Sequence, residues 1–300
     1  MNGHWLTELA VLREDAGLVD LSDRGHIAVT GEDRARWLHA MVSNHIQELA
    51  PGEGCYCFLL DAQGHIQADA YVRVEPERIL LSCEGSVTKK LLEQLDNFIF
   101  MDQVELADLS GRLGTMAVMG PRAAAVLGAV PEGVYMHRGP LFRVEDGFWI
   151  IAPPQELTGW RQRLEAAGAK PVGQKAWNHL RIETGIPRLG VDIGPTTLAQ
   201  ETGQVRAMHF SKGCYLGQEI VERVRSRGRI NRHLAGFKGE GLTAGAKVTV
   251  DGREAGWITS ASEDLALGYL RRDFAAPDTS VQVNGHTAIV RALPSCVFGW

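Results

Sequence analysis

The sequence predicts an α+β protein that ends in a small all-β domain. Strand-like and helix-like stretches alternate as far as about residue 225. From Leu234 onward, six short β-rich runs are separated by glycine-containing turns, a spacing typical of a small β-barrel or sandwich. Between these parts lies Gly185–Phe210, an irregular stretch of 26 residues. A loop of that length is either functional or packed on itself.

The first elements are a strand, a helix and a hairpin. His26–Thr30 is a short β-rich run, and Gly31–Asp33 opens a helix whose early acids suit the positive end of its dipole. Cys55–Leu60 and Ile66–Val74 are strands joined by a four-residue turn that ends in Gly64. Because glycine adopts positive φ readily, this pattern predicts a β-hairpin.

The next stretch predicts an amphipathic helix among short strands. Val87–Phe100 carries apolar residues at helical spacing, and Phe98 belongs to its inward face. Gly120-Pro121 starts another helix, since proline is tolerated in a first turn. Further strands are expected at Ile79–Cys83, Val104–Leu109 and Thr115–Val118.

A second hairpin and three helices follow. Leu141–Val144 and Phe148–Ile151 flank a short acidic turn with a glycine, which is a hairpin signal. Helical periodicity then predicts helices at Pro154–Ala167, Gln174–Glu183 and Tyr215–Arg225.

The composition is that of an ordinary globular protein. It is 45% hydrophobic and 22% charged, which excludes a disordered chain. No stretch of about 18 uncharged apolar residues is present, so we expect no transmembrane helix and no membrane partner. The first residues lack the basic and apolar regions of a secretory signal. Five scattered cysteines fit a reducing cytoplasm better than a disulfide scaffold, so we expect a cytoplasmic protein.

The net charge is unevenly distributed. The whole chain carries −5, but Val205–His233 carries +5, which leaves −10 for all other residues. Nothing in the overall charge favours nucleic acid. The basic segment by contrast calls for a partner.

Cys214 is the candidate reactive group of this segment. It lies in Lys212–Glu219 (KGCYLGQE), at the start of the predicted helix Tyr215–Arg225. Unpaired helix N–H groups and the neighbouring Lys212 stabilise a thiolate there, which would make Cys214 a nucleophile, a redox sensor or a soft-metal ligand. The alternative is a cysteine that packs as a small hydrophobe. No second Cys or His stands at metal-ligand spacing, so no metal site is predicted.

The arginines behind it allow two readings. They form either a solvated face near a helix C-terminus or an anion site for phosphate, a polycarboxylate tail or RNA. Few aromatic residues are interleaved with them, so we expect no direct nucleic-acid binding. The arginines are Arg223, Arg225, Arg227, Arg229 and Arg232.

Other chemical signals are weaker. Strand alternation places Asp69 opposite Ala68, and spacing alone favours a solvent-facing carboxylate. Cys55 and Cys57 share one face of a strand, which favours structural packing. The chain has no Walker A motif, no dinucleotide-binding glycine motif after a strand and no H-E-x-x-H pattern.

Two motifs resemble a known family. Arg181–Gly190 (RIETGIPRLG) and Lys212–Glu219 (KGCYLGQE) are similar to the YgfZ type of folate-binding protein, the bacterial counterpart of mitochondrial iron–sulfur cluster assembly factors. That type lies within the superfamily of the glycine-cleavage aminomethyltransferase, the T-protein. The similarity covers nearly the whole chain and includes the M-V-S-N run at Met41–Asn44.

The resemblance implies a three-domain, ring-like fold with a central folate-sized hole. We expect a discontinuous α/β folate-binding domain (1–27 and 111–230), an inserted α/β domain (28–110) and a C-terminal small β-barrel (231–300). The implied cofactor is tetrahydrofolate or another folate derivative. The implied partners are folate and iron–sulfur client proteins, and we expect a monomer.

The resemblance also implies site residues. Asp69 matches the second of the T-protein's paired acids, which assists attack by folate, and Ala68 replaces the first. Trp149 stands where the T-protein has a pterin-holding Glu, and Trp177 where it has an Arg. Trp177 matches a folate-associated Trp of the YgfZ type, and Arg24 replaces a second such Trp. We therefore expect folate contacts from Arg24, Trp177, Glu183, Tyr215, Gln218, Arg223 and Arg225.

Three functions are compared. The first, which the resemblance favours, is a folate-binding accessory protein for iron–sulfur enzymes and, through them, tRNA modification, with Cys214 as the functional thiol and Lys212 tuning it. The second is a tetrahydrofolate-dependent aminomethyltransferase or demethylase in which Asp69 positions the attacking amine; the missing acidic partner argues against it. The third is an RNA-binding module that uses the basic segment.

Overall fold

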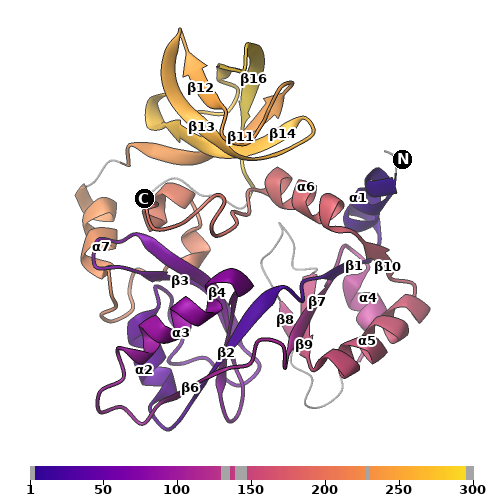
Figure 1. Ribbon diagram of the computed structural model, residues 1–300, viewed down its shortest axis with the longest axis vertical. Helices are drawn as coiled ribbons and strands as arrows, with labels where there is room; N and C mark the ends of the chain where they lie inside the picture. Colours follow the sequence, from indigo (N-terminus) through magenta and orange to yellow (C-terminus); the bar gives the residue numbers. More distant parts are fainter. Residues whose placement is uncertain (1–3, 130–135, 139–146, 228–229, 295–300) are drawn as a thin grey trace. The chain divides into compact units, whose positions relative to one another are not determined.

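The computed structural model describes residues 4–129, 136–138, 147–227 and 230–294 (Figure 1). Within these ranges the strands form two five-stranded sheets and one closed six-stranded barrel. The predicted strand Leu141–Val144 lies outside the described residues, as do Arg229 and Cys296. The side chain of Arg227 is not described either.

The first sheet has the strand order β10-β1-β7-β9-β8. Strand β1 runs parallel to β10 and antiparallel to β7, and the remaining neighbours are antiparallel. Helices α4 and α5 contact β7 and β9. The strands are β1 (Gly17–Asp20), β7 (Gly114–Met119), β8 (Met136–Arg138), β9 (Gly147–Ala152) and β10 (Lys170–Val172), and the helices are α1 (His4–Glu14), α4 (Ala123–Leu127) and α5 (Pro154–Ala166).

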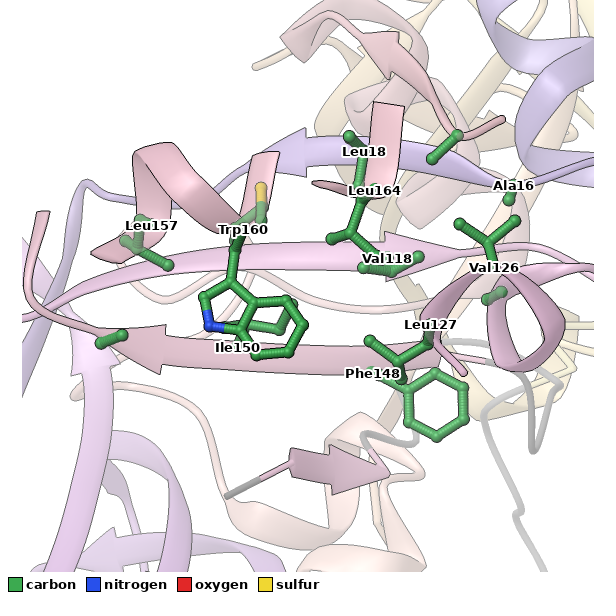
Figure 2. Close-up of a cluster of buried hydrophobic side chains, with 14 residues drawn as sticks. Ala16, Leu18, Val118, Val126, Leu127, Phe148, Ile150, Leu157, Trp160 and Leu164 are labelled. Atoms are coloured by element: carbon green, nitrogen blue, oxygen red, sulfur yellow. The ribbon is translucent and has the colours of Figure 1, made fainter. Parts of the chain in front are cut away.

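A hydrophobic core lies between this sheet and its helices. Figure 2 shows Trp160 and Leu164 of α5 beside Leu18, Val118 and Ile150 of the three central strands. These side chains are all buried. Burial of such residues stabilises the fold by about 1.5–3 kcal/mol each, so the apolar periodicity of Pro154–Ala166 accounts for the position of α5.

The second sheet has the order β3-β4-β5-β2-β6, with β6 at one edge. Its β3–β4 turn contains Gly64 at φ +79°, as the sequence predicts. Helices α2 and α3 contact β2. The strands are β2 (Arg24–Thr30), β3 (Gly54–Leu60), β4 (Ile66–Val74), β5 (Ile79–Glu84) and β6 (Glu105–Asp108), and the helices are α2 (Arg34–Met41) and α3 (Thr88–Asp96), preceded by the 3₁₀ turn η1 (Gly85–Val87).

The C-terminal strands close into a barrel in the order β11-β14-β13-β12-β15-β16. Pairing of β11 with β16 completes the closure. Alternate residues such as Phe237, Val248 and Leu270 fill the interior. The strands are β11 (Arg232–Gly239), β12 (Lys247–Val250), β13 (Arg253–Ser262), β14 (Leu265–Arg271), β15 (Ser280–Val283) and β16 (His286–Arg291), with the 3₁₀ turn η4 (Arg272–Phe274) between β14 and β15.

Two longer helices and an irregular stretch precede the barrel. Helix α6 (Gln174–Thr184) is followed by the predicted irregular stretch, which contains the 3₁₀ turns η2 (Ala199–Thr202) and η3 (Val205–Ala207). Helix α7 (Gln218–Arg227) then begins. Most residues of the irregular stretch are buried, so it is packed against protein rather than loose in solvent.

The chain divides into two compact units. The first consists of residues 1–59, 67–177 and 206–216 and contains nearly all of both five-stranded sheets. The second consists of residues 60–66, 178–205 and 217–300 and contains the barrel.

The predicted fold class is confirmed, because the chain is a mixed α/β protein with a closed six-stranded barrel. All six C-terminal runs are strands. The boundaries of the three expected domains stay a prediction. None of the helices in the described ranges has the length and apolarity that a membrane span requires.

Two element boundaries were predicted wrongly. Helix α3 ends at Asp96, and Phe98, which was expected on its inward face, is 40% exposed. Helix α7 begins at Gln218 rather than at Tyr215, so Cys214 lies in the loop before the helix.

Candidate functional site

Asp69 lies at the centre of a buried polar cluster in the first unit. Its side chain, on β4, accepts a hydrogen bond on Oδ2 from the Tyr56 hydroxyl at 2.8 Å. Its other oxygen, Oδ1, is buried and has no hydrogen-bond partner among the described residues. Asp69 is only 7% exposed, so the prediction of a solvent-facing carboxylate was wrong. The face of β4 that carries Asp69 packs against other parts of the same chain, and strand alternation alone does not reveal this packing.

Burial raises the pKa of Asp69 above its ordinary value. The positive charge of Arg24 and the Tyr56 hydrogen bond oppose this rise, and the charge of Glu84 adds to it. The structure therefore brings together Asp69 and Arg24, two residues that the sequence places far apart. A carboxylate in this setting needs a donor for its second oxygen or it destabilises the fold.

Arg24 projects from β2 onto the same cluster. Its Nη2 donates to the Ser82 carbonyl at 2.9 Å, and its Nη1 lies 3.8 Å from the Glu84 carboxylate. The guanidinium stands 4.8 Å above the Trp149 ring, within cation–π range. Its Nε is buried without a hydrogen-bond partner among the described residues. Asp69 Oδ1 is thus an acceptor, and Arg24 Nε a donor, to which a ligand could hydrogen-bond.

Aromatic rings enclose these polar groups. Tyr71 lies with its ring centre 4.8 Å from that of Tyr56 and 4.5 Å from that of Trp149. Arg206 stands 5.4 Å above the Tyr56 ring. Trp149 is fully buried, so at this position an aromatic ring packs against Arg24 and Tyr71. Sequence reasoning missed Tyr56, Tyr71 and Arg206; the alternation that places Tyr71 beside Asp69 was the available signal.

Lys212 has a role that its sequence position did not suggest. Its buried ammonium donates to the carbonyls of His39, Val42 (2.5 Å) and Asn44 (3.0 Å), at and just after the end of α2. An ammonium has three N–H donors, and these carbonyls take all of them. Burial lowers the pKa of Lys212 to about 8. Lys212 is thus a clip between two segments, and it has no donor left for the Cys214 thiolate.

The clip extends into a wider contact between two sequence motifs. Asn44 Nδ2 donates to the carbonyl of Arg206 at 2.8 Å, and Ser43 Oγ donates to that of Ala207 at 2.5 Å. The N–H of His209 donates to the Ser43 carbonyl at 2.9 Å. We call this contact, with the three bonds of Lys212, the Ser43–Lys212 clip. The clip joins the M-V-S-N run to residues 206–212 through hydrogen bonds to backbone groups.

Cys214 is exposed, two residues beyond the Ser43–Lys212 clip. Because α7 begins four residues later, the expected support from a helix N-terminus is absent. Burial raises the pKa of Cys55 to about 12 and that of Cys57 well above the ordinary value. It also raises the pKa of Cys83. Among the described cysteines, Cys214 is therefore the accessible thiol.

The octet also contacts the hairpin turn within the second unit. Gly217 has φ +82°, and a Cβ there would lie 2.5 Å from the Asp61 carbonyl. A Cβ on Gly64 would lie 3.0 Å from Ile220 of α7. Glycine is required at both positions because the backbone of the turn meets the start of α7 directly.

The other predicted folate-contacting residues lie on α6, on α7 and before α7. Trp177 and Glu183 on α6 are half-buried, as are Tyr215 and Gln218. The Lys212 ammonium stands 4.8 Å above the Tyr215 ring. Arg223 and Arg225 on α7 are exposed, and Arg225 pairs with Glu222 at 3.2 Å.

The described side chains hold no group of three or more His, Cys, Asp or Glu arranged for a metal ion. The rings of His39, His45 and His209 do lie close together, at 4.8 and 5.3 Å between centres. Nδ1 of His39 accepts backbone N–H groups of Ile46 and Gln47, which accounts for its burial.

Comparisons with known proteins give two family matches. Residues 1–139 match the GCVT N-terminal domain, and residues 233–295 match the CAF17 C-terminal β-barrel domain. A putative chloroplastic transferase of Arabidopsis thaliana is 28% identical, over 89% of this chain and 68% of its own length. An aminomethyltransferase of Rippkaea orientalis is 27% identical, over 92% of this chain and 84% of its own.

One solved structure matches over almost the whole chain. The glycine cleavage system aminomethyltransferase T from Bartonella henselae has a TM-score of 0.86, with 99% of this chain and 90% of that chain covered. The two sequences are 24% identical. At that identity the match shows a shared fold.

Proposed function

We propose that this chain, which belongs to the GcvT aminomethyltransferase-like superfamily and joins a GCVT N-terminal domain to a CAF17-type C-terminal barrel, is a folate-binding accessory protein. We further propose that it supports iron–sulfur enzymes and, through them, tRNA modification. The family supports a folate-related role. The more specific role rests on the similarity of its motifs to the YgfZ type and on the site residues.

The observation that carries the proposal is the half-satisfied carboxylate of Asp69. One oxygen is fixed by Tyr56, and the other is a buried acceptor without a partner among the described residues. Tetrahydrofolate carries several ring N–H groups that match such an acceptor through charge-assisted bonds. The residues present therefore fit a folate: Asp69 would accept from it, and Arg24 and Trp177 would bind it by charge and by stacking.

The changed acidic and basic positions favour a binding role over transfer chemistry. A methyl group, that of Ala68, stands in place of the first acid of the T-protein's pair, and it is buried. Trp149 and Trp177 stand in place of a carboxylate and a guanidinium. Without these groups, the chain lacks the charged hydrogen bonds that hold a pterin most tightly. Folate, when bound, supplies nitrogen atoms that carry one-carbon units.

The remaining predicted residues have proposed roles. Cys214 is the functional thiol, and Lys212 places it through the Ser43–Lys212 clip. Glu183, Tyr215 and Gln218 are proposed to contact the folate. Arg223 and Arg225 would bind a polyglutamate tail or a client protein. We also propose that the protein is a cytoplasmic monomer.

Tetrahydrofolate titration, read by tryptophan fluorescence, tests folate binding. Asp69→Asn should weaken binding about tenfold to a hundredfold, because a hydrogen bond to a charged group contributes about 1.5–3 kcal/mol. Trp177→Phe should reduce the fluorescence response. Asp264→Asn, at an exposed carboxylate of the barrel domain, is the matched control. Equal affinity of Asp69→Asn and the control would remove Asp69 from the site.

Complementation tests the accessory role. In a strain that lacks the endogenous homologue, Cys214→Ala should fold and bind folate yet fail to restore tRNA modification. Cys83→Ala, at a buried thiol, should complement. Full activity of Cys214→Ala would refute the role of this thiol.

The second candidate function is a tetrahydrofolate-dependent aminomethyltransferase or demethylase. The buried Asp69 favours it, because a carboxylate of raised pKa suits proton transfer. Purified protein incubated with tetrahydrofolate and an aminomethyl donor decides between the two functions. Turnover that is lost in Asp69→Asn would support transfer chemistry, and binding without turnover would support the accessory role.

A further inference from the structure

An exposed apolar turn lies between α3 and β6 in the first unit. Phe100 is 83% exposed and Met101 is 96% exposed, beside Phe98 at 40%. Single exposed apolar side chains are common on protein surfaces, but three within four residues form a patch that typically marks an interaction site.

The backbone of this turn is held firmly. Trp37 Nε1 donates to the Phe98 carbonyl at 3.2 Å, and Arg36 pairs with Asp102 at 2.6 Å. The N–H of Gln103 donates to Asp33 Oδ2 at 2.9 Å. The turn is thus fixed on both sides of Phe100 and Met101. This rigid frame keeps the two side chains in solvent. Because the turn is already ordered, less conformational entropy is lost when a partner binds it.

Acidic residues outnumber basic ones around the patch. Residues 91–111 contain five acidic residues and no Lys or Arg, although Lys89, Lys90 and Arg112 flank this range. Four of the five are exposed, and Asp102 is the one that pairs with Arg36. The exposed acids are Glu93, Asp96, Glu105 and Asp108.

The patch adjoins an open sheet edge. Strand β6 is the last strand of its sheet, and in the described part of the chain it pairs with β2 alone. Three of its four residues are exposed. An edge strand offers unpaired backbone groups to an incoming extended segment.

We propose that Phe98, Phe100 and Met101, with the surrounding acids and the edge of β6, form a docking surface for a partner protein. The docking segment of that partner carries Lys or Arg around an apolar side chain. Charge complementarity selects this occupant, since the acids attract a basic segment and repel anionic lipid and nucleic acid. The surface is separate from Asp69, so loss of folate binding leaves this proposal intact.

Peptide binding to the full-length protein tests the proposal. The probe is a fluorescent 12-residue peptide of alternating Lys and Leu, and its counterpart has Glu in place of every Lys. The Lys peptide should bind, and Phe100→Ser/Met101→Ser should weaken binding at least tenfold. Leu6→Ser, at an exposed Leu of α1, is the matched control and should keep wild-type affinity. Met101→Ser alone, at 96% exposure, leaves the core untouched and should show part of the loss.

Charge reversal gives a second, independent arm. Asp96→Lys/Glu105→Lys should weaken binding of the Lys peptide and create binding of the Glu peptide. Vesicles of one part phosphatidylglycerol to three parts phosphatidylcholine should not bind the wild type. The proposal is overturned if the Lys peptide does not bind, or if it binds the wild type and Phe100→Ser/Met101→Ser with equal affinity. It is also overturned if the wild type binds the Glu peptide or the vesicles.

Discussion

His26 is a buried histidine that links the two sheets of the first unit. Its Nδ1 lies 3.0 Å from Ser82 Oγ, and its Nε2 lies 3.1 Å from Thr115 Oγ1. Burial lowers the pKa of His26 to about 4, and the charge of Arg24 adds to this effect. The neutral imidazole therefore forms part of the native fold, with both ring nitrogens in hydrogen bonds.

Stability should fall in acid for this reason. In the unfolded chain the imidazole has its ordinary pKa of 6.5, so below that pH the unfolded state binds a proton that the folded state excludes. The stabilisation is complete above pH 6.5 and is lost as the pH falls to 4, a total of about 3 kcal/mol. Urea unfolding at several pH values measures it. His39, whose pKa burial also lowers to about 4, contributes in the same direction.

The variant His26→Gln separates this contribution. It removes the titrating group, so its stability should fall less steeply between pH 6.5 and 4 than that of the wild type. His286→Gln, at an exposed histidine of β16, should keep the wild-type slope. An unchanged slope in His26→Gln would show that other groups cause the acid sensitivity.

Lys212 should contribute to stability rather than to thiol chemistry. Lys212→Met leaves the carbonyls of His39, Val42 and Asn44 without their shared donor, at a cost of about 2–4 kcal/mol. Chemical denaturation measures the loss, and limited proteolysis should show new cleavage near residues 206–216. Lys238→Met, at an exposed lysine of β11, is the control. Unchanged stability with altered alkylation of Cys214 would instead assign Lys212 to the thiol.

At the scale of elements, a buried ion pair joins helix α6 to the irregular stretch, and hydrogen bonds join both to the barrel. Arg181 Nη1 lies 2.7 Å from Asp192 Oδ2, and its Nη2 donates to Ser260 Oγ at 2.8 Å. Asp192 also accepts from the Arg188 N–H at 2.9 Å and from the Ser260 and Thr259 hydroxyls. Every group of this network lies in the second unit and is hydrogen-bonded. From the Arg181–Gly190 motif, the network uses the Arg181 guanidinium and the Arg188 N–H.

Breaking this network should destabilise the second unit strongly. Asp192→Asn removes the charge and leaves the Arg181 guanidinium buried without its counter-ion, at a cost of about 3–5 kcal/mol. Thermal unfolding of the variant should start with the second unit. Arg181→Met/Asp192→Leu should recover part of the loss, because apolar replacement of a whole buried pair is often tolerated. A loss below about 1 kcal/mol in Asp192→Asn would mean that the pair is dispensable.

At the scale of the whole molecule, several cations of the basic segment Val205–His233 contact other residues of the chain. Lys212 is buried against carbonyls, Arg206 stands over Tyr56, and Arg232 pairs with Glu201 at 2.9 Å. Arg225 pairs with Glu222. Val205–His233 contains seven Lys and Arg residues, of which five have described side chains, and four of these five therefore have partners within the chain.

Direct binding of tRNA should accordingly be weak. Few cations remain to displace counterions, and the remainder of the chain is acidic. Fluorescence anisotropy with labelled tRNA should give affinity no tighter than about 10⁻⁴ M at physiological salt, the weak limit of non-specific binding. Tight binding that falls steeply with salt, and that Arg223→Ala/Arg225→Ala abolishes, would restore the RNA-binding hypothesis.

The sequence by itself determined the fold class and many of the elements, but it did not indicate α1, β1 or β10. Strand alternation, glycine turns and apolar periodicity are local signals, so the six barrel strands, the β3–β4 hairpin and helix α5 lie where those signals predict them. The sequence also identified the K-G-C octet, because an uncommon run of residue types can be recognised without a structure.

Only the tertiary structure decided the setting of each polar side chain. Whether Asp69 faces solvent depends on what packs against β4, and one residue that does so, Trp149 against Tyr71, is 80 positions from Asp69. Lys212 lies two residues from Cys214 in sequence, yet its ammonium is hydrogen-bonded to the carbonyls of His39, Val42 and Asn44. Burial and hydrogen bonding arise from contacts between distant segments, and periodicity along one segment carries no information about them.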